Sequence, residues 1–195
     1  KGAIAERIVN AVKIDQNPGG LNMKDMATYK SKKREPVCLF YRQWLICGMG
    51  PPSSGGLTTL QILGILQSFD LPSMRPDEYG QIDPAAAHII AEASKLAFAD
   101  RNLFIADEDF IPVPSAELLD PGYLELRAKE ISNGKTLGKA SPGNLELNQS
   151  WDFSPGTDNT SISTTHISII DGQGNAVSLT SSIESAFGSR LMVDG

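Results

Sequence analysis

A cluster of hydroxyl side chains and one histidine lies late in the chain, where a polar stretch gives way to a β-branched run. The cluster comprises Ser161, Ser163, Thr164, Thr165, His166 and Ser168. A threonine at such a junction suits self-cleavage, in which its hydroxyl attacks the preceding carbonyl carbon and the resulting ester is hydrolysed. The released α-amine, with a pKa of about 7.7 to 8.0, can then serve as the base for the same hydroxyl. Ser and Thr residues at linker ends also cap or solvate the chain, so the residues alone leave both interpretations open.

Two β-branched runs surround this cluster and predict a hairpin. They span residues 165–171 and 176–182, and Gly172-Gln173-Gly174-Asn175 between them is typical of a turn. Strand alternation places His166 on the same face as Thr164. Upstream, residues 134–163 are rich in Gly, Pro, Ser, Asn and Thr without a sustained period, and they predict an exposed linker.

The rest of the chain alternates helical and strand-like patterns. Helices are predicted at residues 2–15, at 23–29, after the Pro- and Gly-rich loop 51–56 with a serine cap, at 85–102, and after Pro121. The apolar runs 37–41 and 44–49 predict a second hairpin. If Arg42-Gln43 forms its two-residue turn, Cys38 lies opposite Cys47.

The two cysteines are too few for a disulfide scaffold or a zinc site, and neither His88 nor His166 lies at ligand spacing from them. No metal site is therefore predicted. In a cross-strand pair with Cα atoms about 4.5 Å apart a disulfide is just feasible, and the sequence leaves open whether the two cysteines are bonded.

Composition excludes several classes of protein. With 195 residues and 41% apolar content, the chain can form one compact domain or a large fragment. The net charge is −6 and the only basic run, residues 30–34, is short, so no nucleic-acid partner is predicted. No stretch reaches the roughly 18 apolar residues that a membrane span needs, and no signal peptide is recognised. We expect a soluble protein or one whose export signal has been removed.

Several motifs resemble the γ-glutamyltransferase family of N-terminal-nucleophile hydrolases, in the family's own order. Residues 41–42, 49–56 and 96–101 resemble its large subunit, and residues 164–171, 174–178 and 187–188 resemble the start of its small subunit. The resemblance covers nearly the whole chain. It implies an α/β (α+β) fold that forms part of a four-layer αββα sandwich.

The resemblance also implies roles for particular residues. Thr164 is the expected nucleophile and, after cleavage of the Ser163–Thr164 bond, its amine is the expected base. The family has a second hydroxyl 18 positions later that orients the nucleophile, and here that residue is Ser182. Residues 1–163 would then be the C-terminal part of the large subunit, with 134–163 as a linker, and residues 164–195 would begin the small subunit.

Glu184 bears on the substrate. The best-known members have an asparagine at this position that helps to hold the α-amino group of the γ-glutamyl substrate, and a carboxylate can accept from an ammonium at least as strongly. Glutaryl-cephalosporin acylases share the fold, but their substrates lack that ammonium, so Glu184 would be left unpaired. Glu184 therefore favours a γ-glutamyl donor.

The resemblance implies a self-processing γ-glutamyl transferase or hydrolase that acts on glutathione and related amides through a γ-glutamyl-threonine ester. The expected acceptors are water, an amino acid or a peptide, with no cofactor. Large and small subunits would form a heterodimer in the periplasm or outside the cell. The alternatives are a cephalosporin (glutaryl) acylase and a binding or zymogen-like module that never cleaves.

The family's oxyanion-hole segment would follow Gly195 and its substrate-binding arginine would precede Lys1, so we expect the isolated chain to be an inactive fragment. Three other features have structural interpretations. We expect Asp100-Arg101 to form an ion pair, His166 to support local structure, and the 51–56 loop to close a strand and cap a helix rather than to bind a nucleotide.

Overall fold

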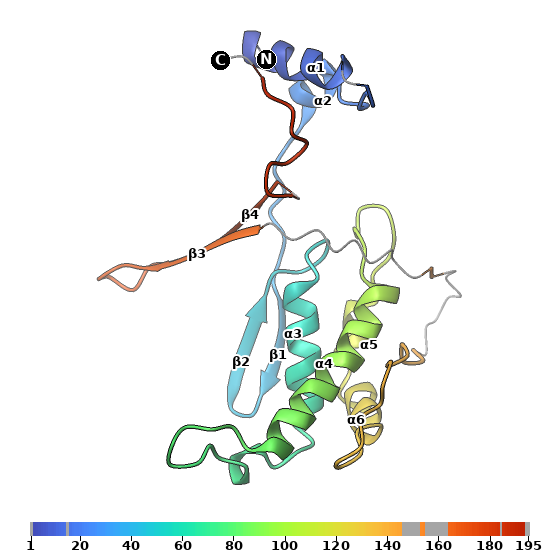
Figure 1. Ribbon diagram of the computed structural model, residues 1–195, viewed down its shortest axis with the longest axis vertical. Coiled ribbons are helices and arrows are strands. Elements are labelled where there is room, and N and C mark those ends of the chain that lie inside the picture. The colour runs from blue at the N-terminus through green and yellow to red at the C-terminus, as the bar shows by residue number, and fades with distance from the viewer. Residues whose placement is uncertain (1, 15, 146–152, 155–163, 184, 194–195) are drawn as a thin grey trace. The chain divides into compact units, whose positions relative to one another are not determined.

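The computed structural model describes residues 2–14, 16–145, 153–154, 164–183 and 185–193 (Figure 1). The chain divides into two compact units, one made of residues 33–157 and the other of residues 1–32 and 158–195. Mixed helices and strands confirm the predicted α/β class. Two of the predicted site residues, Ser163 and Glu184, lie outside the described ranges.

Helix α3 is the centre of the larger unit. The elements of this unit are β1 (Val37–Tyr41), β2 (Trp44–Gly48), α3 (Gly55–Leu66), the 3-10 helix η1 (Leu71–Ser73), α4 (Pro84–Phe104), α5 (Ser115–Leu118) and α6 (Pro121–Lys129). Helix α3 contacts both strands of the hairpin on one side and helices α4 and α6 on the other (Figure 1). Apart from η1 and α5, all of these elements were predicted.

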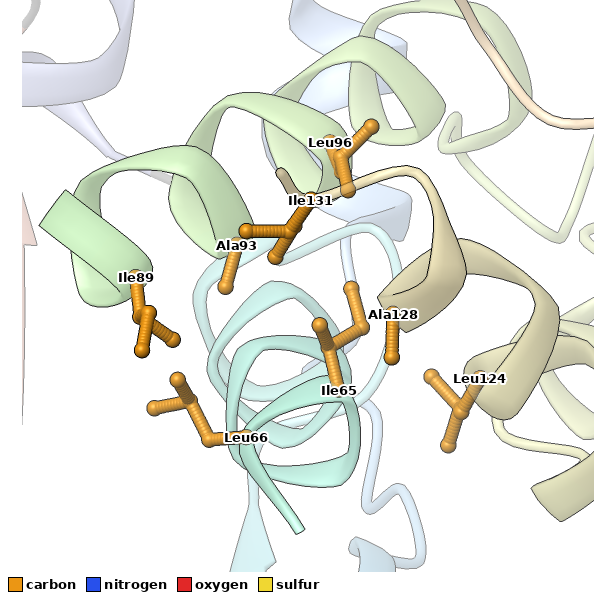
Figure 2. Close-up of a cluster of buried hydrophobic side chains, with 8 residues drawn as sticks. All are labelled: Ile65, Leu66, Ile89, Ala93, Leu96, Leu124, Ala128 and Ile131. Carbon is orange, nitrogen blue, oxygen red and sulfur yellow. The ribbon is translucent and has the colours of Figure 1, made fainter. Parts of the chain in front are cut away.

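The main hydrophobic core lies between α3, α4 and α6 (Figure 2). Its buried side chains are Ile65, Leu66, Ile89, Ala93, Leu96, Leu124, Ala128 and Ile131. Three of them lie on one stripe of α4 because they are spaced by four and three residues. Asp83 and Asp120 cap α4 and α6 by accepting hydrogen bonds from the backbone amides of Ala85 and Tyr123.

The hairpin β1–β2 has the predicted register. Tyr41 pairs with Trp44 and Cys38 with Cys47, and Arg42 adopts the left-handed φ of 58° in the turn. A disulfide bond joins Cys38 and Cys47, whose Cα atoms lie 4.1 Å apart. The structure thus answers the question that the sequence left open.

The loop between β2 and α3 brings the backbone of residues 48–49 close to that of Gly56. A Cβ atom on Gly56 would lie 2.3 Å from the carbonyl oxygen of Met49, and one on Gly48 would lie 2.7 Å from the Cα of Gly56. Only glycine fits at these positions. Ser54 stands at the N-cap of α3, as predicted, but makes no cap hydrogen bond with its side chain. Its hydroxyl instead accepts from Nε of Arg101 at 3.0 Å.

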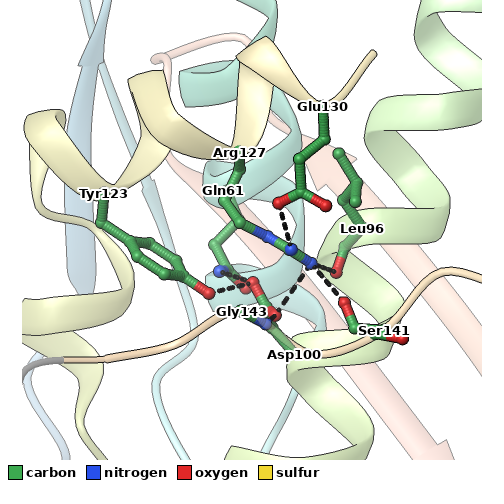
Figure 3. A network of polar contacts seen from close by, with 8 residues as sticks. All are labelled: Gln61, Leu96, Asp100, Tyr123, Arg127, Glu130, Ser141 and Gly143. Carbon is green, nitrogen blue, oxygen red and sulfur yellow. Dashed lines mark hydrogen bonds and ion pairs between the residues drawn. The ribbon is translucent and has the colours of Figure 1, made fainter.

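The expected ion pair between Asp100 and Arg101 is not formed, because adjacent helical residues do not face each other. Asp100 is fully buried and pairs with Arg127 of α6 at 3.1 Å (Figure 3). It also accepts hydrogen bonds from Tyr123 Oη at 2.7 Å, Gln61 Nε2 at 3.1 Å and the backbone amide of Gly143 at 2.8 Å. Burial raises the pKa of Asp100, while the Gly143 amide and the Arg127 charge oppose that rise.

The described part of the predicted linker is largely exposed, yet it is tied to α4 and α6. Glu92 accepts from the backbone amide of Leu137 at 2.8 Å, and Arg127 donates to the carbonyl of Ser141 at 2.9 Å. Together with the bond from Gly143 to Asp100, these contacts fix the backbone of residues 137–143 along the two helices. Figure 3 shows Ser141 and Gly143 in this network.

The smaller unit contains α1 (Ala3–Lys13), α2 (Met23–Thr28), β3 (Thr164–Ile170) and β4 (Ala176–Ser182). Helices α1 and α2 contact each other, and a capping box between Asn22 and Asp25 starts α2. Strands β3 and β4 pair in a separate two-stranded sheet. Among the described residues of the whole chain, no helix has the length and apolarity to cross a membrane.

Candidate active site

The turn that joins β3 and β4 is organised by Asp171. Its Oδ1 accepts from the backbone amides of Gln173 and Asn175, both at 2.9 Å, and its Oδ2 accepts from Asn175 Nδ2 at 2.8 Å. The Asn175 side chain and these amides lower the pKa of Asp171. Gly174 takes the left-handed φ of 86° that the turn requires. The turn thereby fixes the register of the strands.

The antiparallel register gathers six polar side chains on one side of the hairpin, here called the polar face, and mainly apolar side chains on the other. On the polar face, the opposed pairs are Thr164 with Ser182, His166 with Thr180, and Ser168 with Ser178. The opposite face includes Ile167, Ile169, Val177 and Leu179, which are 47% to 58% exposed. The polar face is therefore a continuous row of five hydroxyl groups and one imidazole.

The predicted nucleophile and its predicted orienting residue are direct cross-strand partners. The Thr164 hydroxyl donates to Oγ of Ser182 at 3.3 Å. The pair lies at the end of the hairpin away from the turn, and both residues are exposed. Thr164 is the first residue of β3, so its hydroxyl lies on a regular strand.

His166 occupies the next pair of the polar face. Its Nδ1 lies 2.8 Å from Oγ1 of Thr180 on β4. Its Nε2 lies 3.0 Å from Oγ of Ser168 on its own strand and 3.2 Å from Oγ of Ser178 across the sheet. These three hydroxyls, and not that of Thr164, are the hydrogen-bond partners of His166 within the described ranges, so the geometry gives it a bridging position rather than that of a base in contact with the nucleophile.

The sequence interpretation missed Thr180 and Ser178. The available signal was the alternation along β4, which places Ser178, Thr180 and Ser182 on one face of the strand. With Thr164 assigned to the polar face, pairing through a tight turn brings all three opposite the β3 residues. Within the described ranges, no group of three or more His, Cys, Asp or Glu side chains is arranged to hold a metal ion.

The chain matches the profile of the family described as Gamma-glutamyltranspeptidase over residues 1–195. It is 37% identical over 194 residues to the glutathione hydrolase proenzyme of Escherichia coli strain K12, covering 98% of this chain and 30% of that protein. It is 36% identical over 181 residues to the acylase ACY 1 proenzyme of Pseudomonas sp. strain SE83, covering 92% of this chain and 29% of that protein. The chain thus spans about 30% of the length of these curated relatives.

A solved structure is also similar to this chain. The gamma-glutamyltranspeptidase of Helicobacter pylori is 34% identical to this chain, with a TM-score of 0.67. The superposition covers 77% of this chain and 42% of that one. The structural similarity therefore extends over about three quarters of this chain.

Proposed function

This chain belongs to the gamma-glutamyltranspeptidase family, and we propose that the full-length protein is a self-processing γ-glutamyl transferase or hydrolase with Thr164 as its nucleophile. The observation that carries the assignment is the contact between the hydroxyls of Thr164 and Ser182 at 3.3 Å. It supports a role for Ser182 in orienting the nucleophile. The catalytic roles of both residues are part of the proposal.

Self-cleavage would come first. The Thr164 hydroxyl attacks the carbonyl carbon of Ser163, the C–N bond between the two residues breaks, and the acyl group moves from nitrogen to oxygen. Water then hydrolyses this ester, which regenerates the hydroxyl and leaves a free α-amine on Thr164. The names of the two relatives, both proenzymes, support processing of this kind.

Turnover would use the same oxygen. The free amine of Thr164 accepts the hydroxyl proton, directly or through water, as the oxygen attacks the γ-amide carbon of glutathione or a similar donor. The amine product leaves with a proton, and a γ-glutamyl ester remains on Thr164. Water, an amino acid or a peptide amine then takes the acyl group. This sequence of steps requires no metal or cofactor.

The proposed cleavage defines two subunits. Residues 1–163 would contribute to the large subunit, residues 134–163 would lead to the cut, and residues 164–195 would begin the small subunit. The two pieces would remain together as a heterodimer. We place the protein in the periplasm or outside the cell, a location supported by the disulfide between Cys38 and Cys47, because such bonds persist in oxidising compartments.

An acylase is the second candidate, favoured by the 36% identity to acylase ACY 1. The two functions differ in their substrates, because a γ-glutamyl group carries an α-amino group and a glutaryl group does not. Glu184 favours the γ-glutamyl donor because its carboxylate can pair with that ammonium. The comparison to make is kcat/KM for a γ-glutamyl anilide against a glutaryl amide, measured on the full-length protein and on Glu184→Gln.

The γ-glutamyl assignment predicts preference for the anilide and a fall in that preference in Glu184→Gln, because the amide side chain keeps the shape but loses the charge. The glutaryl amide serves as the internal control, since its turnover should change little. A wild type that prefers the glutaryl amide, with turnover of that substrate unchanged or improved by Glu184→Gln, would establish the acylase instead.

A further inference from the structure

Among the six side chains of the row formed by residues 164, 166, 168, 178, 180 and 182, only that of His166 lacks a hydroxyl. His166 has hydroxyl groups around both ring nitrogens, with Thr180 at Nδ1 and with Ser168 and Ser178 at Nε2. A hydroxyl can rotate to donate in several directions, whereas the imidazole is planar and has fixed directions for its two nitrogens. His166 is therefore the one rigid polar group that connects the two strands in this row.

The neighbouring pair needs such support. Thr164 and Ser182 end their strands, and the terminal pair of a hairpin opens most readily. Their hydroxyls are 3.3 Å apart, whereas an O–H···O hydrogen bond typically measures about 2.7 to 2.8 Å. On the proposed function, cleavage also removes the covalent restraint that residue 163 places on Thr164. The strand pairing then has to hold the nucleophile.

We propose that His166 is a positioning residue for Thr164, acting through its contact with Thr180. This inference rests on the proposed function, since it assigns a role in the same site. The contact from Nδ1 to Thr180 spans the two strands in the pair next to Thr164 and Ser182 on the polar face. It holds β4 against β3 there, and so keeps the Ser182 hydroxyl opposite the nucleophile.

The two ring nitrogens can be tested separately. The side-chain amide of asparagine places a polar atom where Nδ1 lies, so His166→Asn can retain the contact with Thr180. The longer glutamine side chain places its amide near Nε2, so His166→Gln can retain contacts with Ser168 and Ser178 but not with Thr180. His166→Leu retains neither, and Thr180→Val removes the partner while keeping the shape.

The experiment measures self-cleavage and the turnover of a γ-glutamyl anilide by the full-length variants. Active sites are counted from the burst of anilide released in the first turnover, so that misfolded protein does not affect kcat. We expect His166→Leu, His166→Gln and Thr180→Val each to lower kcat about tenfold, with KM within about twofold, as for loss of one hydrogen bond. His166→Asn should remain within about threefold of wild type. The double variant His166→Leu with Thr180→Val should be no slower than either single variant.

Equal rates for His166→Asn and His166→Gln, a normal kcat in His166→Leu, or additive losses in the double variant would overturn the positioning role. In each of these cases an active wild type leaves the proposed function standing. A wild type that neither cuts itself nor turns over the anilide would overturn the proposed function, and the role of His166 with it.

Discussion

At the level of single residues, Thr164 and Ser182 form the expected contact between their hydroxyls, but the hydrogen bond is long. An oxygen that must attack in one direction benefits from a partner that restricts its rotation. The Thr164–Ser182 hydrogen bond is long at 3.3 Å, so on the proposed function Ser182 would contribute orientation rather than strong polarisation. Ser182 should thus assist both self-cleavage and turnover without being essential to either.

Ser182→Ala in the full-length protein should therefore slow both reactions about tenfold, the effect of losing one hydrogen bond of about 0.5 to 1.5 kcal/mol. Its matched control is Ser181→Ala, which makes the same change on the opposite face of β4 and should alter neither rate. Single-turnover rates of cleavage and kcat for a γ-glutamyl anilide give the comparison. Equal effects of the two substitutions would show that Ser182 has no specific role in orienting Thr164.

The sequence predicted some residue contacts better than others. The contact of Thr164 with Ser182 was expected from the family resemblance, and the register of the hairpin agrees with it. The partner of Asp100 could not be found in this way, because Arg127 is 27 residues away on another helix. Ion pairs between distant helices depend on packing that has no local signature, and the adjacent Arg101 suggested the wrong partner.

At the level of elements, helix α4 does more than supply the core. Glu92 and Asp100 lie eight residues apart on it, close to two whole turns, and both accept backbone amides from residues 137–143. The pattern of Gly, Pro and Ser correctly predicted that this segment has no helix or strand. It could not predict that the segment is bound along a helix, because the contacts use backbone groups that every residue carries.

Gly143 is the tightest point of that contact. A Cβ atom there would lie 2.2 Å from Oη of Tyr123, and this hydroxyl is held at 2.7 Å from Asp100. Gly143→Ala should therefore destabilise the full-length protein by about 1 to 3 kcal/mol, the usual cost of overpacking. The exposed neighbour provides the control, since Asn144→Ala should change the denaturation midpoint very little. An unchanged midpoint for Gly143→Ala would show that the network can move aside.

Glu92 should make the stability of the fold depend on pH in the acid range. Hydrogen bonds from Lys95, from the Leu137 amide and from the Thr136 hydroxyl lower the pKa of Glu92 to about 2, from an ordinary 4.5. A folded-state pKa below the unfolded value means that ionised Glu92 stabilises the fold above pH 4.5, and that this contribution disappears as the pH falls toward 2.

Glu92→Gln should accordingly lower the melting temperature at pH 7, and its difference from wild type should shrink between about pH 4.5 and 2. Glu78→Gln, an exposed site, is the control with no such trend. Thermal unfolding of the full-length protein across this range makes the measurement. A difference between wild type and Glu92→Gln that stays constant with pH would contradict the role assigned to the carboxylate.

At the level of the whole molecule, the predicted helices and hairpins are present, and family membership identifies them as part of an N-terminal-nucleophile hydrolase fold. Helical periodicity and turn residues determined these elements because both are local signals. The short elements η1 and α5 were missed, since three or four residues are too few to display a period. The strands β3 and β4 are exposed on both faces, so a hydrophobic core could not have identified the site within them.

The central claim is that Thr164 is the nucleophile of self-cleavage and becomes the N-terminal residue of the second piece. The most direct test is intact-mass analysis of the purified full-length protein, with N-terminal sequencing of any C-terminal piece, for wild type and Thr164→Ala. We predict two pieces in the wild type, the second beginning at Thr164, and a single uncut, inactive chain in Thr164→Ala. A wild type that stays uncut, a second piece beginning at Ser163 or Thr165, or cleavage of Thr164→Ala would contradict the assignment.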